Sequence, residues 1–395
     1  MNPAKPEIVY VFPDKLGGVF SYVDSLLTHR RDDGCEHAAI LTDNLIDPDT
    51  RTRESLRADR VERFQYSLPP ENLHAVLARL AKLIPRRQGV IVANSWIELA
   101  LATAHDTGRA VIAITHGDGG WYYDVARTND QVIDAYITYT TRMESRLREM
   151  FPERGDSIAL LPYGIDIPTV TRTPAPISMP LRLLYVGRLS RDKGVFDLPE
   201  IAAELKRRGV AVHWTIQGGG PAEAELRKLW PDPEVVWNGV QPMDAVLRLY
   251  RSHDVLVMPC RGEGLPVALL EAGAAGVVPV ISNLASGIPE VVENGVTGYR
   301  PEPGDIAGFV DAIASIAAHR TALEAMSGAV RALVASRYDA NVCTSRYQDF
   351  YARVMAGRKP WTRRPLPYGS RLDRPWIPNA VVQMVRRMTV PSLRG

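Results

Sequence analysis

The sequence predicts an α/β protein of two domains, each built around a parallel sheet. Short apolar runs alternate along the chain with segments of helical periodicity, and this alternation is typical of βαβ units. The length of 395 residues suits two domains of ordinary size, each with its own core. A polar stretch rich in proline, near the middle of the chain, separates two such series and indicates the domain boundary.

The first series, residues 1–168, predicts an N-terminal Rossmann-like domain. Glu7-Ile-Val-Tyr-Val-Phe12 has the composition of a first strand, and the Gly17-Gly18 turn after it allows backbone to approach a ligand closely. His116 follows a later strand directly, at the edge where open α/β sheets bind ligands, although a lone histidine there is often structural. The other expected elements are strands at 38–42, 89–94, 110–115 and 136–139 and helices at 20–27 and 75–84.

The second series predicts a C-terminal domain over residues 181–345, after the proline-rich linker 169–180. Residues 346–395 then form a last helix and a tail. The expected strands lie at 181–187, 212–217, 235–240, 254–259 and 277–282, and the expected helices at 198–208, 306–318 and 340–355.

One stretch of the second domain predicts a phosphate site. Glu263-Gly-Leu-Pro266 links two buried strands through a helix of roughly four turns. Gly264 permits a close approach, and Pro266 suits the first helical position, where its missing N–H costs nothing. The N–H groups around Gly264 and Leu265 would then favour an anion by roughly 0.3–2 kcal/mol.

Two carboxylates, Glu263 and Glu271, bracket this helix start. Eight positions at about 1.5 Å each place them on the order of 10–12 Å apart. An inverting glycosidase keeps its acid and base within about 9.5 Å, so the two would not act as one pair. The distance suits gripping hydroxyls at both ends of a sugar–diphosphate–ribose ligand. The alternative interpretation is that Glu263 only caps the helix and Glu271 is a solvated helix residue.

Two cations, Arg188 and Lys193, follow the strand that ends at Gly187. A departing diphosphate gains negative charge in the transition state, and a fixed cation stabilises that state by about 3–4 kcal/mol. Arginine can bind two phosphate oxygens at once, while lysine supplies a point charge.

These motifs resemble retaining nucleotide-sugar glycosyltransferases of family four, which have the GT-B fold. Glu263 to Glu271 resembles their E-x7-E motif, residues 187–194 resemble G-R-L-x-x-x-K-G, and 218–221 resemble a Gly-rich GdGp turn. Tyr163 departs from the asparagine that is usual in a fourth motif at 162–166. The resemblance implies two Rossmann-like domains facing a central cleft, with the last helix crossing back to the first domain.

The resemblance also implies roles for particular residues. Arg188 and Lys193 would neutralise the diphosphate, Glu263 would hold the donor sugar and Glu271 the ribose. The implied catalytic set is Arg188, Lys193, Glu263 and His116, and the implied donor-binding set is Gly17, Gly18, Gly187, Gly218, Gly239, Val240, Gly264, Leu265, Pro266 and Glu271.

The expected partners are a UDP- or GDP-sugar donor and a saccharide or lipid-linked saccharide acceptor of polysaccharide or glycolipid assembly. No nucleic acid is expected. No Asp-x-Asp motif stands at a strand end, so neither a metal nor another cofactor is implied. The alternatives are a GT-B sugar-nucleotide epimerase and a catalytically silent nucleotide-sugar-binding protein. The presence of both the E-x7-E and the G-R-L-x-x-x-K-G motifs argues against an epimerase, and the intact set of Glu263, Glu271, Arg188 and Lys193 argues against a silent binding protein.

The tail is strongly basic although the net charge of the whole chain is only +2. Residues 357–395 contain nine Arg and Lys residues and one acid, Asp373. Such a tail could bind an anionic membrane surface, or it could be solvated or pack along the surface of one domain. Three dispersed cysteines and the lack of a long apolar run predict a cytoplasmic protein, and a lipid-binding tail would place it peripherally on the cytoplasmic face of the membrane.

Overall fold

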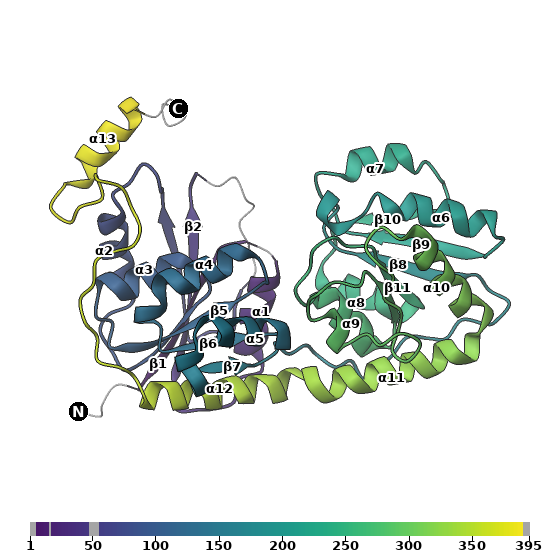
Figure 1. Ribbon diagram of the computed structural model, residues 1–395, viewed down its shortest axis with the longest axis horizontal. Helices are drawn as coiled ribbons and strands as arrows, with labels where there is room; N and C mark the ends of the chain where they lie inside the picture. The colour runs from purple at the N-terminus through teal and green to yellow at the C-terminus, as the bar shows by residue number, and fades with distance from the viewer. Residues whose placement is uncertain (1–4, 16, 47–54, 390–395) are drawn as a thin grey trace. The chain divides into compact units, whose positions relative to one another are not determined.

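The computed structural model describes residues 5–15, 17–46 and 55–389 and divides the chain into two compact units. Unit 1 contains residues 1–164 and 341–395, and unit 2 contains residues 165–340. Each unit is a parallel sheet covered by helices (Figure 1). The prediction of two Rossmann-like α/β units is therefore confirmed. The stretch 169–180, expected as a linker, is part of unit 2.

Unit 1 has a seven-stranded sheet in the order β3-β2-β1-β4-β5-β6-β7, with every pair parallel. Its strands are β1 (Glu7–Pro13), β2 (Glu36–Asn44), β3 (Arg60–Tyr66), β4 (Gly89–Ala93), β5 (Arg109–Thr115), β6 (Ala135–Thr138) and β7 (Ile158–Leu160). Its helices are α1 (Gly18–Thr28), α2 (Leu73–Leu83), α3 (Trp96–Ala104), α4 (Gly120–Asn129), α5 (Thr141–Met150), α12 (Ala340–Ala356) and α13 (Asn379–Thr389).

The central strands β1, β4 and β5 are buried along almost their whole length because helices cover both faces of the sheet. This is why they are continuous apolar runs rather than alternating ones. Edge strand β3 differs, since it alternates exposed and buried positions and buries only Phe64 and Tyr66.

Unit 2 has a five-stranded parallel sheet in the order β10-β9-β8-β11-β12. Its strands are β8 (Leu181–Val186), β9 (Val212–Gln217), β10 (Val236–Gly239), β11 (Val255–Met258) and β12 (Val278–Ile281). Its helices are α6 (Asp197–Arg207), α7 (Glu223–Leu229), α8 (Met243–Ser252), α9 (Val267–Ala275), α10 (Ile306–Ala318) and α11 (Arg320–Tyr338). The chain builds outward from β8 to β10 and then returns to β11 on the other side of β8. The topological switch point, where open sheets bind ligands, thus lies between β8 and β11.

The last helix before the tail confirms the predicted crossover. Helix α12 follows unit 2 in the sequence but belongs to unit 1, where the Tyr347 hydroxyl donates to the carbonyl oxygen of Leu161. The segment after it, residues 357–378, runs along unit 1 beside α2 and α3 and leads into α13 (yellow in Figure 1). Arg358 pairs with Asp106 at 2.7 Å, and the Trp361 indole donates to the carbonyl oxygen of Ala102 at 2.8 Å. We call residues 357–389 the C-terminal strap.

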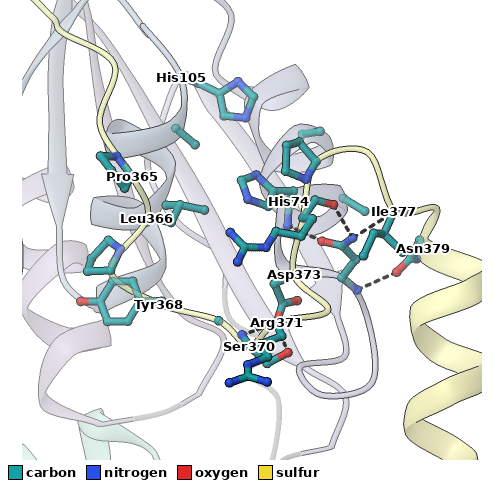
Figure 2. A pocket seen from close by; sticks show the side chains of 18 of the residues that line it. His74, His105, Pro365, Leu366, Tyr368, Ser370, Arg371, Asp373, Ile377 and Asn379 are labelled. Atoms are coloured by element: carbon teal, nitrogen blue, oxygen red, sulfur yellow. Dashed lines mark hydrogen bonds between the residues drawn. The ribbon is translucent and has the colours of Figure 1, made fainter.

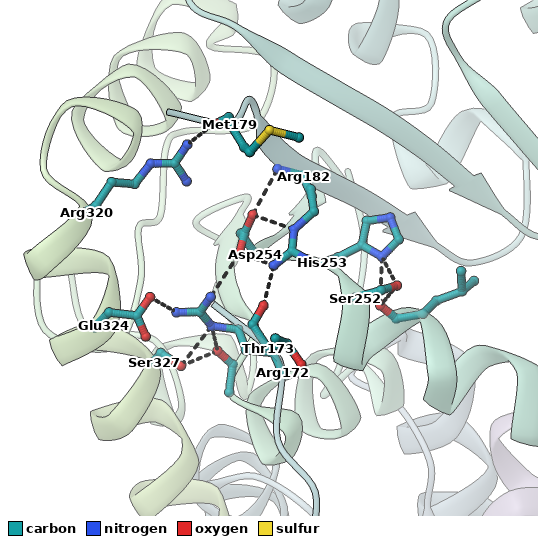
Figure 3. Close-up of polar contacts among 12 residues, drawn as sticks. Arg172, Thr173, Met179, Arg182, Ser252, His253, Asp254, Arg320, Glu324 and Ser327 are labelled. Atoms are coloured by element: carbon teal, nitrogen blue, oxygen red, sulfur yellow. Dashed lines mark hydrogen bonds and ion pairs between the residues drawn. The ribbon is translucent and has the colours of Figure 1, made fainter. Parts of the chain in front are cut away.

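A buried ionic network ties residues 165–180 to the rest of unit 2 (Figure 3). The Asp254 carboxylate accepts hydrogen bonds from Arg172 at 2.9 Å and from Arg182 at 2.7 and 3.0 Å. Arg172 also pairs with Glu324 of α11 at 2.5 Å. Burial alone would raise the pKa of Asp254, but the bonds and charges of the two arginines lower it overall. Each buried charge is therefore compensated.

No single helix within the described ranges is long and apolar enough to cross a membrane. Helices α10 and α11 pass this test only as a pair, and they are bent by 106° relative to each other. The apolar residues Phe309, Ile313 and Val330 of this pair are buried within unit 2.

Candidate active site

Four loops meet at the carboxyl edge of the unit 2 sheet, and they carry most of the predicted site residues. Gly187 and Arg188 follow β8, Gly218 follows β9, Val240 follows β10, and Glu263 follows β11. The loops are joined through their backbones. Gly187 N–H donates to Gln217 at 3.0 Å, and Gly218 N–H donates to Gly239 at 2.9 Å. The N–H of Arg261, in the β11 loop, donates to Asp192 at 2.8 Å.

Glycine is required where these loops touch. A Cβ at Gly218 would lie 1.9 Å from the carbonyl oxygen of Gly187, and one at Gly194 would lie 1.7 Å from that of Pro259. Gly194 also has φ +65°, in the left-handed region. The motif glycines therefore hold adjacent loops in contact, which fixes the positions of the side chains that they carry.

The structure brings Lys193 and Glu263 together across the switch point. Their side chains form an ion pair and are 23% and 18% exposed. Arg188 is exposed, and its guanidinium has no hydrogen-bond or ion-pair partner within the described part of the chain. The edge therefore presents Arg188 in the same loop as Lys193, and the charges of both cations help to lower the pKa of Asp192 between them in the sequence. This arrangement can bind an anion and a hydroxyl-bearing group side by side.

Helix α9 differs from its prediction. It has nine residues, about two and a half turns rather than four. Pro266 precedes it, with an extended ψ of 128°, and Gly276 ends it in the left-handed region with φ +82°. Glu271 lies in its second turn, and its carboxylate accepts a hydrogen bond from the Tyr250 hydroxyl at 3.0 Å. Burial raises the pKa of Glu271, and the Tyr250 bond partly opposes this shift.

Arg261 stands beside Glu263, but its charge is used within the fold. Its guanidinium donates to Asp197 at 2.7 and 2.9 Å and to the carbonyl oxygen of Pro259 at 3.0 Å. It therefore braces the start of α6 against the β11 loop.

The remaining predicted residues, His116, Gly17 and Gly18, belong to unit 1. Gly18 begins α1, and Gly17 is its N-cap. His116 directly follows β5, and both of its ring nitrogens are engaged: Nε2 donates to Asn94 Oδ1 at 2.8 Å, and Nδ1 accepts from Tyr139 at 2.7 Å. Burial lowers the pKa of His116 to about 3, so the ring is neutral at ordinary pH. This geometry suits a role in positioning rather than in proton transfer.

A buried carboxyl, that of Glu98, shares the hydrogen-bond partner Asn94 with His116. Glu98 of α3 is fully buried, Oε1 accepts from the Asn94 N–H at 3.2 Å, and Oε2 has no partner within the described residues. Burial raises the pKa of Glu98 to about 8. The Glu98 side chain is therefore largely protonated at neutral pH.

Replacing Glu98 with glutamine should change how stability depends on pH. The unfolded carboxyl loses its proton near pH 4.5 and the folded one near 8, so the contribution of Glu98 to the free energy of unfolding falls by about 1.4 kcal/mol per pH unit between these values. Glu98→Gln removes this contribution. We would measure the free energy of unfolding in urea for wild type and variant at several pH values. The difference between the two at each pH gives the contribution of Glu98. Exposed Glu149→Gln is the control, and equal slopes in wild type and Glu98→Gln would contradict the assignment.

Sequence reasoning missed an apolar pocket of about 600 Å³ in unit 1. Trp96 and Trp121 line it at the starts of α3 and α4, and Tyr368 of the strap packs on Trp96 with ring centroids 4.9 Å apart. The polar lining groups Asp373, Ser370 and Arg386 bond to one another. The pocket thus suits an apolar group. In the sequence, only Trp121, five residues after His116, could have indicated this pocket. The other residues that line it are Leu68, Pro69, Leu73, Val125 and Gly369.

Within the described residues, no group of three or more His, Cys, Asp or Glu side chains is placed to hold a metal ion.

Comparison with known proteins matches residues 180–319, most of unit 2, to the family model described as glycosyl transferases group 1. A glycogen synthase of Mycobacterium tuberculosis is 31% identical over 61% of this chain and 59% of its own length. A GDP-mannose-dependent alpha-(1-6)-phosphatidylinositol monomannoside mannosyltransferase of the same organism is 30% identical over 61% of this chain and 69% of its own length. The matches thus span about six tenths of the first relative and just over two thirds of the second.

The structure of Anabaena HepE in complex with UDP and glucose matches 88% of this chain and 100% of its own, with a TM-score of 0.71 and 16% identity. At this identity the likeness shows the fold, which is GT-B. The fold and the mannosyltransferase match together identify the family: this chain belongs to the group 1 glycosyltransferases.

Proposed function

We propose that this protein is a glycosyltransferase that moves a sugar from a UDP- or GDP-sugar to a saccharide or lipid-linked saccharide, with retention of anomeric configuration. The observation that carries the proposal is the switch-point edge of unit 2, where unpaired Arg188 lies in the loop system of the Lys193–Glu263 pair. Two relatives support the donor class, since one is named as GDP-mannose-dependent and HepE binds UDP.

In this reaction the bond between the anomeric carbon and the diphosphate oxygen breaks, and a bond to the acceptor oxygen forms. The acceptor proton passes to the departing phosphate on the same face of the sugar. Arg188 and Lys193 stabilise the charge that develops on the diphosphate, so neither a metal ion nor another cofactor is required. When Lys193 turns to phosphate, Glu263 becomes available to the donor hydroxyls. Glu271 binds the ribose, and Gly239 and Val240 lie against the base.

The apolar pocket supports a lipid-linked acceptor. It lies at the carboxyl ends of unit 1 strands, where His116 follows β5 in the short loop that leads to Trp121 at the start of α4. An acceptor whose apolar part fills this pocket would place its saccharide near His116 and the Gly17-Gly18 turn. We therefore propose a role in cell-surface polysaccharide or glycolipid assembly, on the cytoplasmic face of the membrane.

A panel of UDP, GDP, ADP and CMP with their common sugars tests the proposal. A nucleotide at about 100 times its dissociation constant stabilises a protein by roughly 2.7 kcal/mol, which thermal unfolding resolves. We expect one uridine or guanosine donor to stabilise the chain and to release its nucleoside diphosphate when acceptor is added. Stabilisation without release under any acceptor would identify a silent binding protein, and an unchanged melting temperature with every nucleotide would contradict the proposal.

A further inference from the structure

The C-terminal strap places an amphipathic helix on unit 1 with its apolar side outward. Asn379, Val382 and Arg386 of α13 face unit 1: Val382 is buried, Asn379 Oδ1 accepts the N–H of Asn72, and Arg386 pairs with Asp373. At 3.6 residues per turn, Val381, Met384 and Met388 fall on the opposite side. These three are 43%, 58% and 64% exposed. The helix is thus anchored by one side and exposes an apolar row on the other.

The strap beside α13 carries an excess of positive charge. A cavity of about 1110 Å³ between α2 and the strap is lined by Arg363, Arg364, Arg371 and Arg374 together with His74 and His105. Figure 2 shows Arg371 and the two histidines at this cavity. Among the described residues, Asp373 is the only acid that lines it, and that carboxylate is bonded to Arg386, Ser370 and the N–H of Leu73. Burial lowers the pKa of His74. The charge of Asp373 raises this pKa, and the charges of Arg363 and Arg374 lower it.

Neighbouring acids do not neutralise these arginines. Glu71 pairs with Arg79, and Asp106 pairs with Arg86 and Arg358. Within the described residues, Arg363 and Arg371 form no ion pair with an acid and are exposed. Arg374 lies over the ring of Trp376, which is 74% exposed. An exposed tryptophan beside arginines and an apolar helical row has the composition of a bilayer-interface segment.

We infer that α13 and the arginines of the strap form a membrane-contact surface for anionic lipid bilayers. The apolar row enters the boundary between headgroups and acyl chains, and Arg363, Arg371 and Arg374 meet lipid phosphates. A second copy of the chain is a poor occupant, since it would bring two arginine-rich surfaces together. An acidic protein would satisfy the arginines but gives no reason for an apolar row ending in two flexible methionines.

Vesicle co-sedimentation of the full chain tests the inference. We expect binding to phosphatidylcholine vesicles with about 30 mol% phosphatidylglycerol, weakening as salt rises, and little binding to phosphatidylcholine alone. Arg371→Ala and Arg374→Ala should each weaken binding about fivefold. A Val381→Ser, Met384→Ser, Met388→Ser variant should weaken it by about tenfold or more. The matched controls are Ile177→Ser and Arg207→Ala, exposed residues of unit 2, which should bind as wild type does.

Because the side chains substituted in the strap are exposed and form no ion pair within the described residues, the melting temperature of each of these variants should stay that of wild type. Equal binding to neutral and anionic vesicles, or no binding at low salt, would overturn the inference. So would a dimer by light scattering that the serine variant dissociates, since that would assign the apolar row to a second copy. The experiment uses neither donor nor acceptor, so its failure would leave the proposed activity untouched.

Discussion

Arg188→Ala is expected to lower kcat by about 100- to 1,000-fold and to change the KM for the donor much less. The reason is that negative charge on the leaving diphosphate grows in the transition state, so a fixed cation stabilises that state more than the bound donor. Arg188 has no side-chain partner within the described part of the chain, so its removal leaves no buried acid unpaired. Steady-state kinetics with the donor found in the nucleotide panel give both constants.

Two further variants sharpen this prediction. Arg207→Ala is the control, because Arg207 is an exposed arginine of α6 that pairs with Glu204, and its kinetics should match wild type. Arg188→Lys should recover part of the rate, since lysine restores the positive charge but cannot bind two phosphate oxygens in the bidentate manner of arginine. A rise in KM with unchanged kcat in Arg188→Ala would show that this arginine binds donor and transition state equally, against the role proposed for it.

Asp254→Ala is expected to destabilise unit 2 by about 3–5 kcal/mol. It would leave Arg172, whose side chain is buried, without its main counter-charge, and would remove three hydrogen bonds from Arg182. Urea unfolding followed by tryptophan fluorescence, with Trp214 and Trp230 in the unit 2 core, measures the loss. Residues 165–180 should become more accessible to protease in the same variant.

Glu324→Ala provides the matched comparison because Glu324 binds the same arginine but is 47% exposed. Its loss should cost less than about 1 kcal/mol. Equal effects of the two substitutions would show that burial of Asp254 does not set the energy of the network.

Much of the fold could be predicted because buried parallel strands are continuous apolar runs. The expected strand at 212–217 matches β9, and the expected helix at 306–318 matches α10. Edge strand β3 was not recognised because one of its faces is polar. Helix α11 was also missed, although Leu323, Met326, Val330 and Val334 recur at helical spacing.

The candidate site was predictable only where one short motif holds it. The motifs located Arg188, Lys193 and Glu263, but sequence spacing could not show that Lys193 and Glu263 form a pair. Nor could it show that both nitrogens of His116 are already bonded. The apolar pocket and α13 were missed for a different reason. They depend on the strap returning to α2 and α3, which brings Tyr368 onto Trp96 from more than 250 positions away.

Hydrogen–deuterium exchange of the full chain, with and without the best nucleotide diphosphate, tests the central claim most directly. The account predicts slower exchange in the loops after β8, β9, β10 and β11, at residues 187–194, 218–220, 239–241 and 263–267, and loss of this protection in Arg188→Ala. Protection confined to unit 1, or protection in unit 2 that Arg188→Ala leaves intact, would contradict the assignment of the donor site.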